Sequence, residues 1–353
     1  MTSIRRPQKA PKGLTFNSSP PKRSFDASSL SDHGPQAKRQ REMSPPPQLS
    51  VKTRILILSD THGVNALPET ITESIDVVLH CGDLSQGGEL ESYRKTITLL
   101  SSIKAPLKLV IPGNHDLSLD EKYWAANCKP EGAHIHAEAR AIWTGKEAAG
   151  IRLLEPGLQE LVLENGGVLR IYASPATPTP MQGGAWAFGY GTNEDIYNPA
   201  GTGISYGTNT STPGTEIPDG AKIDIMMTHG PAKYQLDRTR NGDSVGCPHL
   251  FRALRRIRPR VHAFGHVHDS WGVWRILWEE ERGPLPEDDD GSDNGVKGTK
   301  AVEVSGAKGV QVIEGVVRNE GMETLLVNAA LMGDAEKLEK LPWVIEMDLP
   351  LVE

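Results

Sequence analysis

Short apolar runs alternate with segments of helical spacing along most of the chain. Each run ends at glycine or at a polar residue, which is typical of buried β-strands. Two segments, 89–103 and 248–257, place leucine and isoleucine at helical spacing. Strands that alternate with helices predict an α/β fold, in which ligands gather outside the carboxyl ends of the strands. The runs that carry this pattern are residues 54–60, 76–83, 107–116, 222–230 and 260–268.

All of these runs end in side chains of metal-binding type, and every donor is oxygen or nitrogen. A single motif such as Asp-x-His arises by chance in many chains, so each one alone is weak evidence for a metal site. Donors at successive strand ends of one chain are strong evidence, because the fold brings strand ends together. In chain order the candidate site residues are Asp60, His62, Asp83, Asn114, His115, Asp116, His229, His266 and His268.

Electrostatics explains why such a group would bind metal. Carboxylates and imidazoles that share one cleft shift each other's pKa values unless a positive charge lies among them. Two divalent cations provide that charge. With Asp60 and Asp83 ionised and the histidines neutral, the centre keeps about two positive charges, which match one phosphodiester anion and one hydroxide.

The motifs at these strand ends resemble those of the calcineurin-like metallophosphoesterase superfamily. The resemblance covers most of the chain after residue 54 and implies an α/β sandwich of two mixed β-sheets flanked by helices. The stretches that carry it read SDTHG (59–63), CGDLSQGG (81–88), PGNHD (112–116), THGP (228–231) and FGHVH (264–268).

The resemblance also implies a role for each metal donor. A first ion would be held by Asp60, His62 and His268. A second ion would be held by Asn114, His229 and His266, with Asp83 bridging both. Two ions in such a site clamp the attacking and leaving oxygens and turn bound water into a nucleophile near neutral pH. The donor types suit Mn, Fe and Zn, and the resemblance favours manganese.

The predicted catalytic residues are His115 and Asp116. His115 lies beside Asn114 in the sequence and is placed to donate a proton to the leaving alkoxide, a contribution of about 10²–10⁴ in rate. Asp116 is expected to fix the tautomer and orientation of the His115 ring.

Two stretches decide between branches of the superfamily. GDLSQGG and GNHD separate this chain from the serine/threonine protein phosphatases, which carry GDxxDRG and GNHE. The turn after His229 and the ending LVNAALMG … LPWVIEMDLP are most similar to the metallophosphoesterase domain-containing (MPPED) proteins. That similarity implies a manganese-supported phosphodiesterase that acts on cyclic nucleotides and aryl diesters. Two alternatives stay open, a phosphomonoesterase and a nucleotide-binding regulatory scaffold with little turnover.

Composition narrows the class of protein. The chain has 353 residues, of which 37% are apolar and 24% charged, and no run reaches the ~18 apolar residues of a membrane helix. The basic start lacks the apolar stretch of a secretory signal, and three scattered cysteines fit reduced thiols. We therefore expect an intracellular, cytoplasmic enzyme with a small phosphodiester or nucleotide as substrate. We expect no membrane or nucleic acid partner, and the sequence leaves the oligomeric state open.

Two biased segments interrupt this picture. Residues 1–50 hold 9 Lys/Arg against 3 Asp/Glu, so this segment carries +6 and the remainder −13. Because it is rich in Pro and Ser and poor in periodic apolar residues, we expect a disordered basic tail. Its two basic clusters make a nuclear location the alternative. Residues 51–353 would form the metallophosphoesterase domain, with an acidic loop insertion at about 279–298.

Four other histidines have simpler explanations than metal binding. His80 and His262 lie inside apolar runs, and we expect them in the core or in the wall of the cleft. His134 and His136 lack a neighbouring glycine turn, and we expect them on the surface or in a strand.

Two thiols, an aromatic stretch and a basic run also have simpler explanations than a binding site. Cys81 and Cys247 are expected as buried, inert thiols. The stretch AWAFGYG (185–191) is expected to pack as a loop, with base stacking as the alternative. The basic run 252–260 is expected to form a solvated helix face rather than a nucleic acid contact.

Overall fold

The computed structural model describes nine stretches of the chain. The predicted basic tail falls almost wholly outside them, as do residues 281–295 of the predicted acidic loop. Residues 296–298 of that loop already belong to a strand. The described stretches are 49–145, 148–179, 186–200, 208–211, 214–280, 296–307, 309–313, 321–333 and 337–352.

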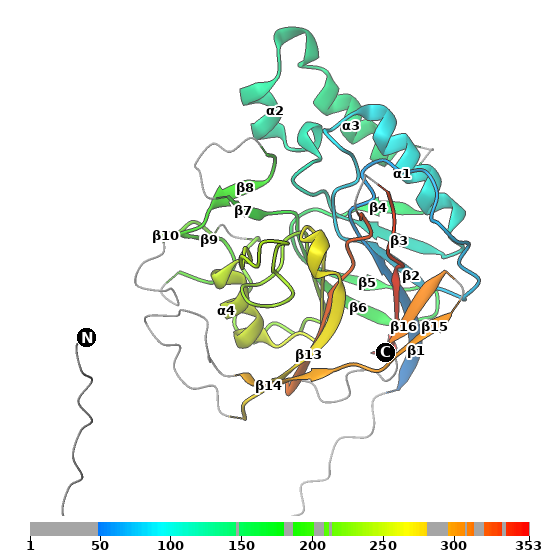
Figure 1. Ribbon diagram of the computed structural model, residues 1–353, viewed down its shortest axis with the longest axis vertical. Helices are drawn as coiled ribbons and strands as arrows, with labels where there is room; N and C mark the ends of the chain where they lie inside the picture. Colours follow the sequence, from blue (N-terminus) through cyan, green and yellow to red (C-terminus); the bar gives the residue numbers. More distant parts are fainter. Residues whose placement is uncertain are drawn as a thin grey trace, which may run out of the picture. The chain divides into compact units, whose positions relative to one another are not determined.

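Two seven-stranded mixed sheets form the centre of the fold (Figure 1). The first has the order β15 (Val304–Ala307), β16 (Val310–Ile313), β18 (Trp343–Pro350), β1 (Ser50–Leu58), β2 (Val77–His80), β3 (Leu107–Val110) and β4 (Ile151–Leu153). The second has the order β14 (Val296–Ala301), β13 (Gly272–Trp278), β17 (Glu323–Asn328), β12 (Val261–Phe264), β11 (Ile225–Thr228), β6 (Val168–Ser174) and β5 (Gly157–Val162). The predicted α/β sandwich of two mixed sheets is therefore confirmed.

A block of four parallel strands reaches the edge of the first sheet at β4 and lies in the middle of the second sheet. β1, β2, β3 and β4 are parallel neighbours, and so are β6, β11, β12 and β17. Parallel neighbours end at the same edge of a sheet, so the loops that follow β1, β2 and β3 are adjacent, as are those that follow β11 and β12. Two further pairs of short parallel strands are β7 (Thr177–Thr179) with β8 (Gly189–Gly191), and β9 (Glu194–Asp195) with β10 (Thr208–Asn209).

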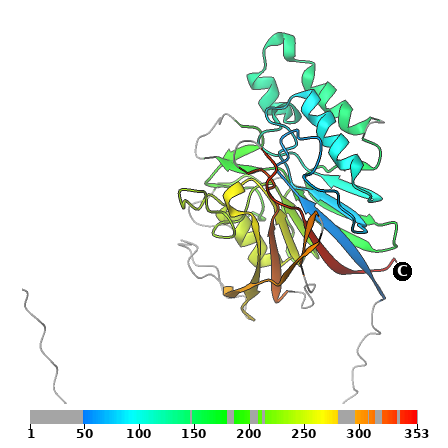
Figure 2. The same cartoon turned by 45° about the vertical axis from the view of Figure 1, so that its right-hand side comes forward.

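Four α-helices are described, and three of them cover the sheets. α1 (Leu90–Ser102) and α3 (Ile135–Thr144) share a hydrophobic cluster with β1, and α4 (Pro248–Ile257) shares one with β11 and β12 (Figure 2). The two helices expected at 89–103 and 248–257 are thus present, because both carried apolar side chains on one face. The fourth, α2 (Glu121–Asn127), buries no residue.

The alternation of side chains along a strand separates the layers. In β1, Ile55 and Ile57 belong to the core between the two sheets, whereas Leu56 and Leu58 belong to the cluster under α1 and α3. Because both faces of the strand are covered, its sequence reads as a continuous apolar run. None of the described helices has the length and apolarity needed to cross a membrane.

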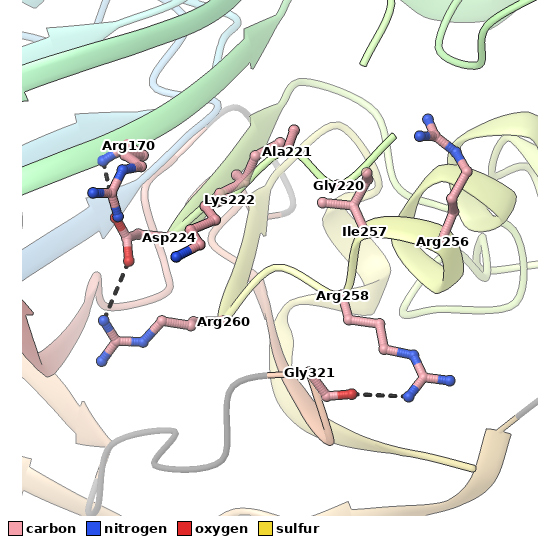
Figure 3. Close-up of a pocket in the computed structure, with 11 residues that line it drawn as sticks. Arg170, Gly220, Ala221, Lys222, Asp224, Arg256, Ile257, Arg258, Arg260 and Gly321 are labelled. Carbon is pink, nitrogen blue, oxygen red and sulfur yellow. Dashed lines mark hydrogen bonds and ion pairs between the residues drawn. The ribbon is translucent and has the colours of Figure 1, made fainter. Parts of the chain in front are cut away.

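The basic run 252–260 is not a solvated helix face, and that expectation was wrong. Arg252 is 4% exposed and Arg260 7% exposed. Arg258 donates to the carbonyl of Gly321, and Arg260 lies 3.3 Å from a carboxylate oxygen of Asp224 (Figure 3). Charge pattern alone could not show this, because long arginine stems can be buried while their heads reach carbonyl and carboxylate oxygens.

The histidines inside apolar runs are buried, as expected. The hydroxyl of Thr61 lies 2.8 Å from Nε2 of His80, and that of Thr228 lies 2.8 Å from Nε2 of His262. Burial lowers the pKa of His262 to about 3. His262 therefore stays neutral in the folded protein at pH values where it would be charged in the unfolded chain.

His134 and His136 lie at the start of helix α3 rather than in a strand. His134 is exposed, whereas Nδ1 of His136 donates to the carbonyl of Ser118. Cys81 and Cys247 are buried free thiols, as expected. Burial raises the pKa of both thiols, so neither behaves as a reactive thiolate.

We predict that His262 makes folding stability depend on pH. Its depressed pKa means that the unfolded state binds the extra proton, so acidification from about pH 7 to about pH 4 should destabilise the fold through this residue by about 3 kcal/mol. His262→Gln should therefore lose less stability than wild type over this range. Urea unfolding followed by circular dichroism measures the difference. His134→Gln is the exposed control and should lose as much as wild type; an unchanged pH dependence in His262→Gln would contradict the prediction.

Candidate metal centre

The candidate residues come together where strands of both sheets end. Asp60 and His62 follow β1, and Asp83 follows β2. Residues 114–116 follow β3, His229 follows β11, and residues 266–268 follow β12. The parallel order β1-β2-β3 and the pair β11-β12 bring these loops together. Residues far apart in the chain thus share one site, such as Asp60 and His268, 208 positions apart.

Three overlapping groups of donor atoms are close enough to hold metal ions. In each group the donor atoms all lie within 4.8 Å of one another. The groups are Asp60 with His62 and His268, Asp83 with His229 and His266, and His62 with Asp83 and His115. Asn114 adjoins the second group, because its Oδ1 lies 2.9 Å from Nε2 of His229.

Asp83 lies between the groups. Its Oδ2 is 3.7 Å from Nε2 of His62, and its Oδ1 is 3.3 Å from Nε2 of His229. Its Oδ1 also accepts a hydrogen bond of 2.9 Å from the main chain of His115. One carboxylate therefore faces two sets of donors with its two oxygens.

The backbone takes up a rare conformation at four of the candidate residues. Asp60, His62, Asp83 and His266 have φ values of 57°, 46°, 54° and 67°. L-residues seldom adopt this left-handed region, and each such residue costs on the order of 1–3 kcal/mol. Non-glycine residues in this conformation cluster at functional sites, where surrounding contacts maintain them.

Glycines supply the space that these side chains occupy. A Cβ on Gly265 would lie 2.1 Å from Oδ2 of Asp60, and one on Gly113 would lie 2.3 Å from Oδ1 of Asp83. Sequence reasoning missed this role, although the signal was present in the glycines that precede Asn114 and His266 in GN and GH.

The electrostatics of the site favour ionised carboxylates. Burial alone would raise the pKa of Asp60, but the hydrogen bond from His268 and the charges of nearby histidines hold that pKa well below its usual range. Likewise, despite burial, His229 lowers the pKa of Asp83 to about 2. Burial lowers the pKa of His266 to about 4.

A positive charge is favoured next to Asp83. Burial would lower the pKa of His229, but Asp83 outweighs this effect and raises it to about 9. A proton on His229 or a divalent cation among the donors can supply the charge that the buried carboxylate requires.

The residues fit a divalent metal ion. Both ring nitrogens of His62 are buried, and neither has a hydrogen-bond partner in the described part of the chain. Burial lowers the pKa of His62, which favours the neutral imidazole that binds metal. Nδ1 of His229 donates to the carbonyl of Cys81, which directs Nε2 toward Asn114 and Asp83. Carboxylate, amide and imidazole donors together suit Mn, Fe or Zn.

His115 lies at the edge of these groups and is partly exposed. Its Nδ1 donates to the carbonyl of Gln86 at 2.8 Å, so Nε2 is the ring nitrogen left for other chemistry. Its ring centroid is 4.8 Å from that of His62 and 4.2 Å from that of Trp186. The sequence had predicted neither the Gln86 contact nor the Trp186 contact, since both residues belong to loops without periodic patterns.

Asp116 does not orient the His115 ring, and this expectation is corrected. Its carboxylate accepts hydrogen bonds of 2.7–3.0 Å from the main chains of Leu84, Ser85 and Gly113 and from the Ser85 hydroxyl. Burial and the charge of a neighbouring carboxylate raise the pKa of Asp116 to about 7. Asp116 thus ties the loop after β3 to the loop after β2, while a backbone carbonyl holds His115.

Comparisons with known proteins agree with this geometry. The family model described as calcineurin-like phosphoesterase matches residues 53–270. Metallophosphoesterase domain-containing protein 1 of Homo sapiens is 31% identical over 229 residues, which are 63% of this chain and 62% of that protein. UPF0046 protein T07D4.2 of Caenorhabditis elegans is 26% identical over 260 residues, 67% of this chain and 58% of that protein. The match therefore spans less than two thirds of either relative.

We predict that Gly265→Ala disrupts metal binding. The new Cβ would collide with the Asp60 carboxylate, so Asp60 has to move away from His268. Displacing a ligand should lower metal affinity by at least the roughly 10–100-fold that loss of a residue supporting a ligand costs. The measurement is manganese content after equilibrium dialysis at several metal concentrations. Gly306→Ala is the control, because a Cβ there meets nothing within 4 Å. Wild-type affinity in Gly265→Ala would show that Asp60 is not a ligand.

Proposed function

Because this chain belongs to the calcineurin-like phosphoesterase family, we propose that it is a metal-dependent phosphodiesterase that hydrolyses a small phosphodiester such as a cyclic nucleotide. The observation that supports this function best is the position of Asp83 between two groups of metal donors. A carboxylate with each oxygen toward a different group is suited to a two-metal centre.

The distances in the site support the following ligand sets. One ion would be held by Asp60, His62 and His268. The other would be held by Asn114, His229 and His266, with Asp83 shared between them. When bound, divalent ions of this kind neutralise phosphate oxygens and lower the pKa of water. Manganese is the ion that we propose, since the mixed donors accept it.

His115 would supply the proton for the leaving oxygen. Its Nδ1 is engaged with the Gln86 carbonyl, which fixes the ring and leaves Nε2 as the nitrogen that can carry the transferred proton. The centroid of its ring lies 4.8 Å from that of the His62 ring, and His115 is partly exposed. The ring therefore lies at the edge of the group of proposed metal donors. A general acid must reach the leaving group in this way while staying accessible to exchange its proton with water.

Charges beside the centre favour a diester over a monoester. A cleft of about 340 Å³ next to His268 is lined by Arg240, Lys340 and Glu339 among others. Arg240 pairs with Asp269 at 3.2 Å, and Lys340 donates to the main-chain oxygens of His268 and Met332. These cations are already engaged, and Glu339 adds a negative charge. A diester monoanion therefore suits this surrounding better than a monoester dianion.

We predict that the Mn²⁺-loaded protein hydrolyses bis(p-nitrophenyl) phosphate, and does so faster than p-nitrophenyl phosphate. Chelation should abolish both activities. The measurement is release of p-nitrophenolate under matched conditions. No turnover of any diester by fully metal-loaded protein would refute the enzyme, and a preference for the monoester would identify a phosphomonoesterase instead.

We predict that His115→Ala lowers kcat without removing metal. Loss of the proton donor should reduce kcat by about 10²–10⁴ for a diester with an alkyl leaving group, and by less for p-nitrophenol, which needs little protonation. Manganese content should equal that of wild type. His134→Ala is the matched surface control. A wild-type kcat on both diesters would exclude His115 as the acid.

A further inference from the structure

A large aromatic side chain lies beside the proposed general acid. The ring centroids of Trp186 and His115 are 4.2 Å apart, and the rings are tilted by 41°. Trp186 is 44% exposed, whereas Trp143, Trp278 and Trp343 are at most 3% exposed. Unlike these three tryptophans, Trp186 is not part of the core. Its indole exposes an apolar surface next to His115.

The backbone beside Trp186 is attached to the loops of the site. The main chain of Ala187 donates to the carbonyl of Asn114 at 3.1 Å. The main chain of Phe188 donates to the Asp120 carboxylate at 2.6 Å. Since Asn114 is also a proposed metal ligand, the main chain next to Trp186 is tied to the loop that carries it.

Trp186 also lines a cleft. The cleft has a volume of about 480 Å³, within the range of small-molecule sites. α2 contributes Lys122 and Tyr123, and the β7-β8 pair contributes Thr179 and Tyr190. The lining combines three aromatic rings with several polar side chains, among them the carboxylates of Asp120 and Glu194, and its rings suit a planar heteroaromatic or aryl group.

Resting on the proposed function, we propose that Trp186 selects substrates whose leaving alcohol carries an aromatic ring, by stacking on that ring. The leaving oxygen has to lie next to His115, because His115 protonates it. Whatever is attached to that oxygen then lies next to Trp186, which contacts His115. The substituent that stays on phosphorus lies away from this side. Stacking of this kind changes affinity by roughly 5- to 150-fold.

Three diesters separate the leaving group from the retained group. Methyl p-nitrophenyl phosphate is aromatic only in its leaving alcohol, bis(p-nitrophenyl) phosphate is aromatic on both sides, and glycerophosphocholine has no aromatic ring. Trp186→Ala should raise KM for the first two by about 5- to 150-fold and leave KM for the third unchanged. Trp186→Phe should restore most of the loss, because phenylalanine still offers a ring face.

A second exposed tryptophan provides the control for the loss of an indole. Trp274→Ala removes an equally exposed tryptophan, 46%, from β13 and should change none of the three KM values. A KM effect of Trp186→Ala on bis(p-nitrophenyl) phosphate alone would place the ring of the retained group on Trp186 and overturn the proposal. Equal effects on all three diesters would mean that Trp186 only supports the fold of the site.

A binding measurement distinguishes failure of this inference from failure of the proposed function. Calorimetric titration of the Mn²⁺-loaded protein with methyl p-nitrobenzylphosphonate needs no turnover, because a carbon atom replaces the leaving oxygen. We expect this analogue to bind wild type about 5- to 150-fold more tightly than Trp186→Ala, and methyl methylphosphonate, which has no ring, to bind both equally. Equal affinities of wild type and Trp186→Ala for the nitrobenzyl analogue would overturn the stacking role even if diesters are hydrolysed. Absence of hydrolysis with Trp186-dependent binding of the analogue would refute the phosphodiesterase while supporting the aromatic contact.

Discussion

The charge of one buried carboxylate governs the site. Asp83 is 2% exposed, and its two oxygens face His62 on one side and His229 on the other. A carboxylate removed from water is tolerated only next to compensating positive charge and hydrogen-bond donors. The surrounding imidazoles provide part of this compensation, as the lowered pKa of Asp83 and the raised pKa of His229 show. The Asp83 carboxylate thus contacts both sets of donors, through His62 in one and His229 in the other.

The sandwich provides the rigidity that this arrangement requires. Left-handed backbone at Asp60, His62, Asp83 and His266 is locally unfavourable, and it persists because the strands before these residues are fixed. β1, β2, β11 and β12 are buried on both faces over the residues that lead into the site. The core between the sheets therefore offsets the strain at the strand ends and keeps the donors within reach of one another.

The ends of the strands could be predicted from the sequence, because each buried apolar run is followed within a few residues by a polar side chain that can bind metal. The contact of Asp60 with His268 could be expected only through the order of the strands and the resemblance to a known family. Side-chain directions in loops could not be predicted. Asp116 binds the loop after β2 instead of the ring next to it, because the main-chain amides of Leu84 and Ser85 in that loop donate to its carboxylate, as does Gly113 in its own loop.

Buried charge was a second limit of the sequence pattern. The arginines of 252–260 are typical of a solvated helix face in the sequence. The spacing of polar residues does not show which carbonyl oxygens of the folded chain will accept hydrogen bonds from buried arginines. Trp186 is the opposite case, a residue expected to pack that is exposed. Its segment is typical of loop packing, yet the indole is exposed beside His115, while the main chain of the next two residues is bonded to Asn114 and Asp120.

The fold positions the proposed metal donors, and loops carry the proposed substrate contacts. The most direct test of the charge balance at Asp83 is anomalous diffraction from crystals of the full chain grown with Mn²⁺. We expect two manganese peaks about 3.5–4 Å apart, with one oxygen of Asp83 bound to each. A single peak away from Asp83, or no peak at saturating metal, would contradict a metal centre built around this carboxylate.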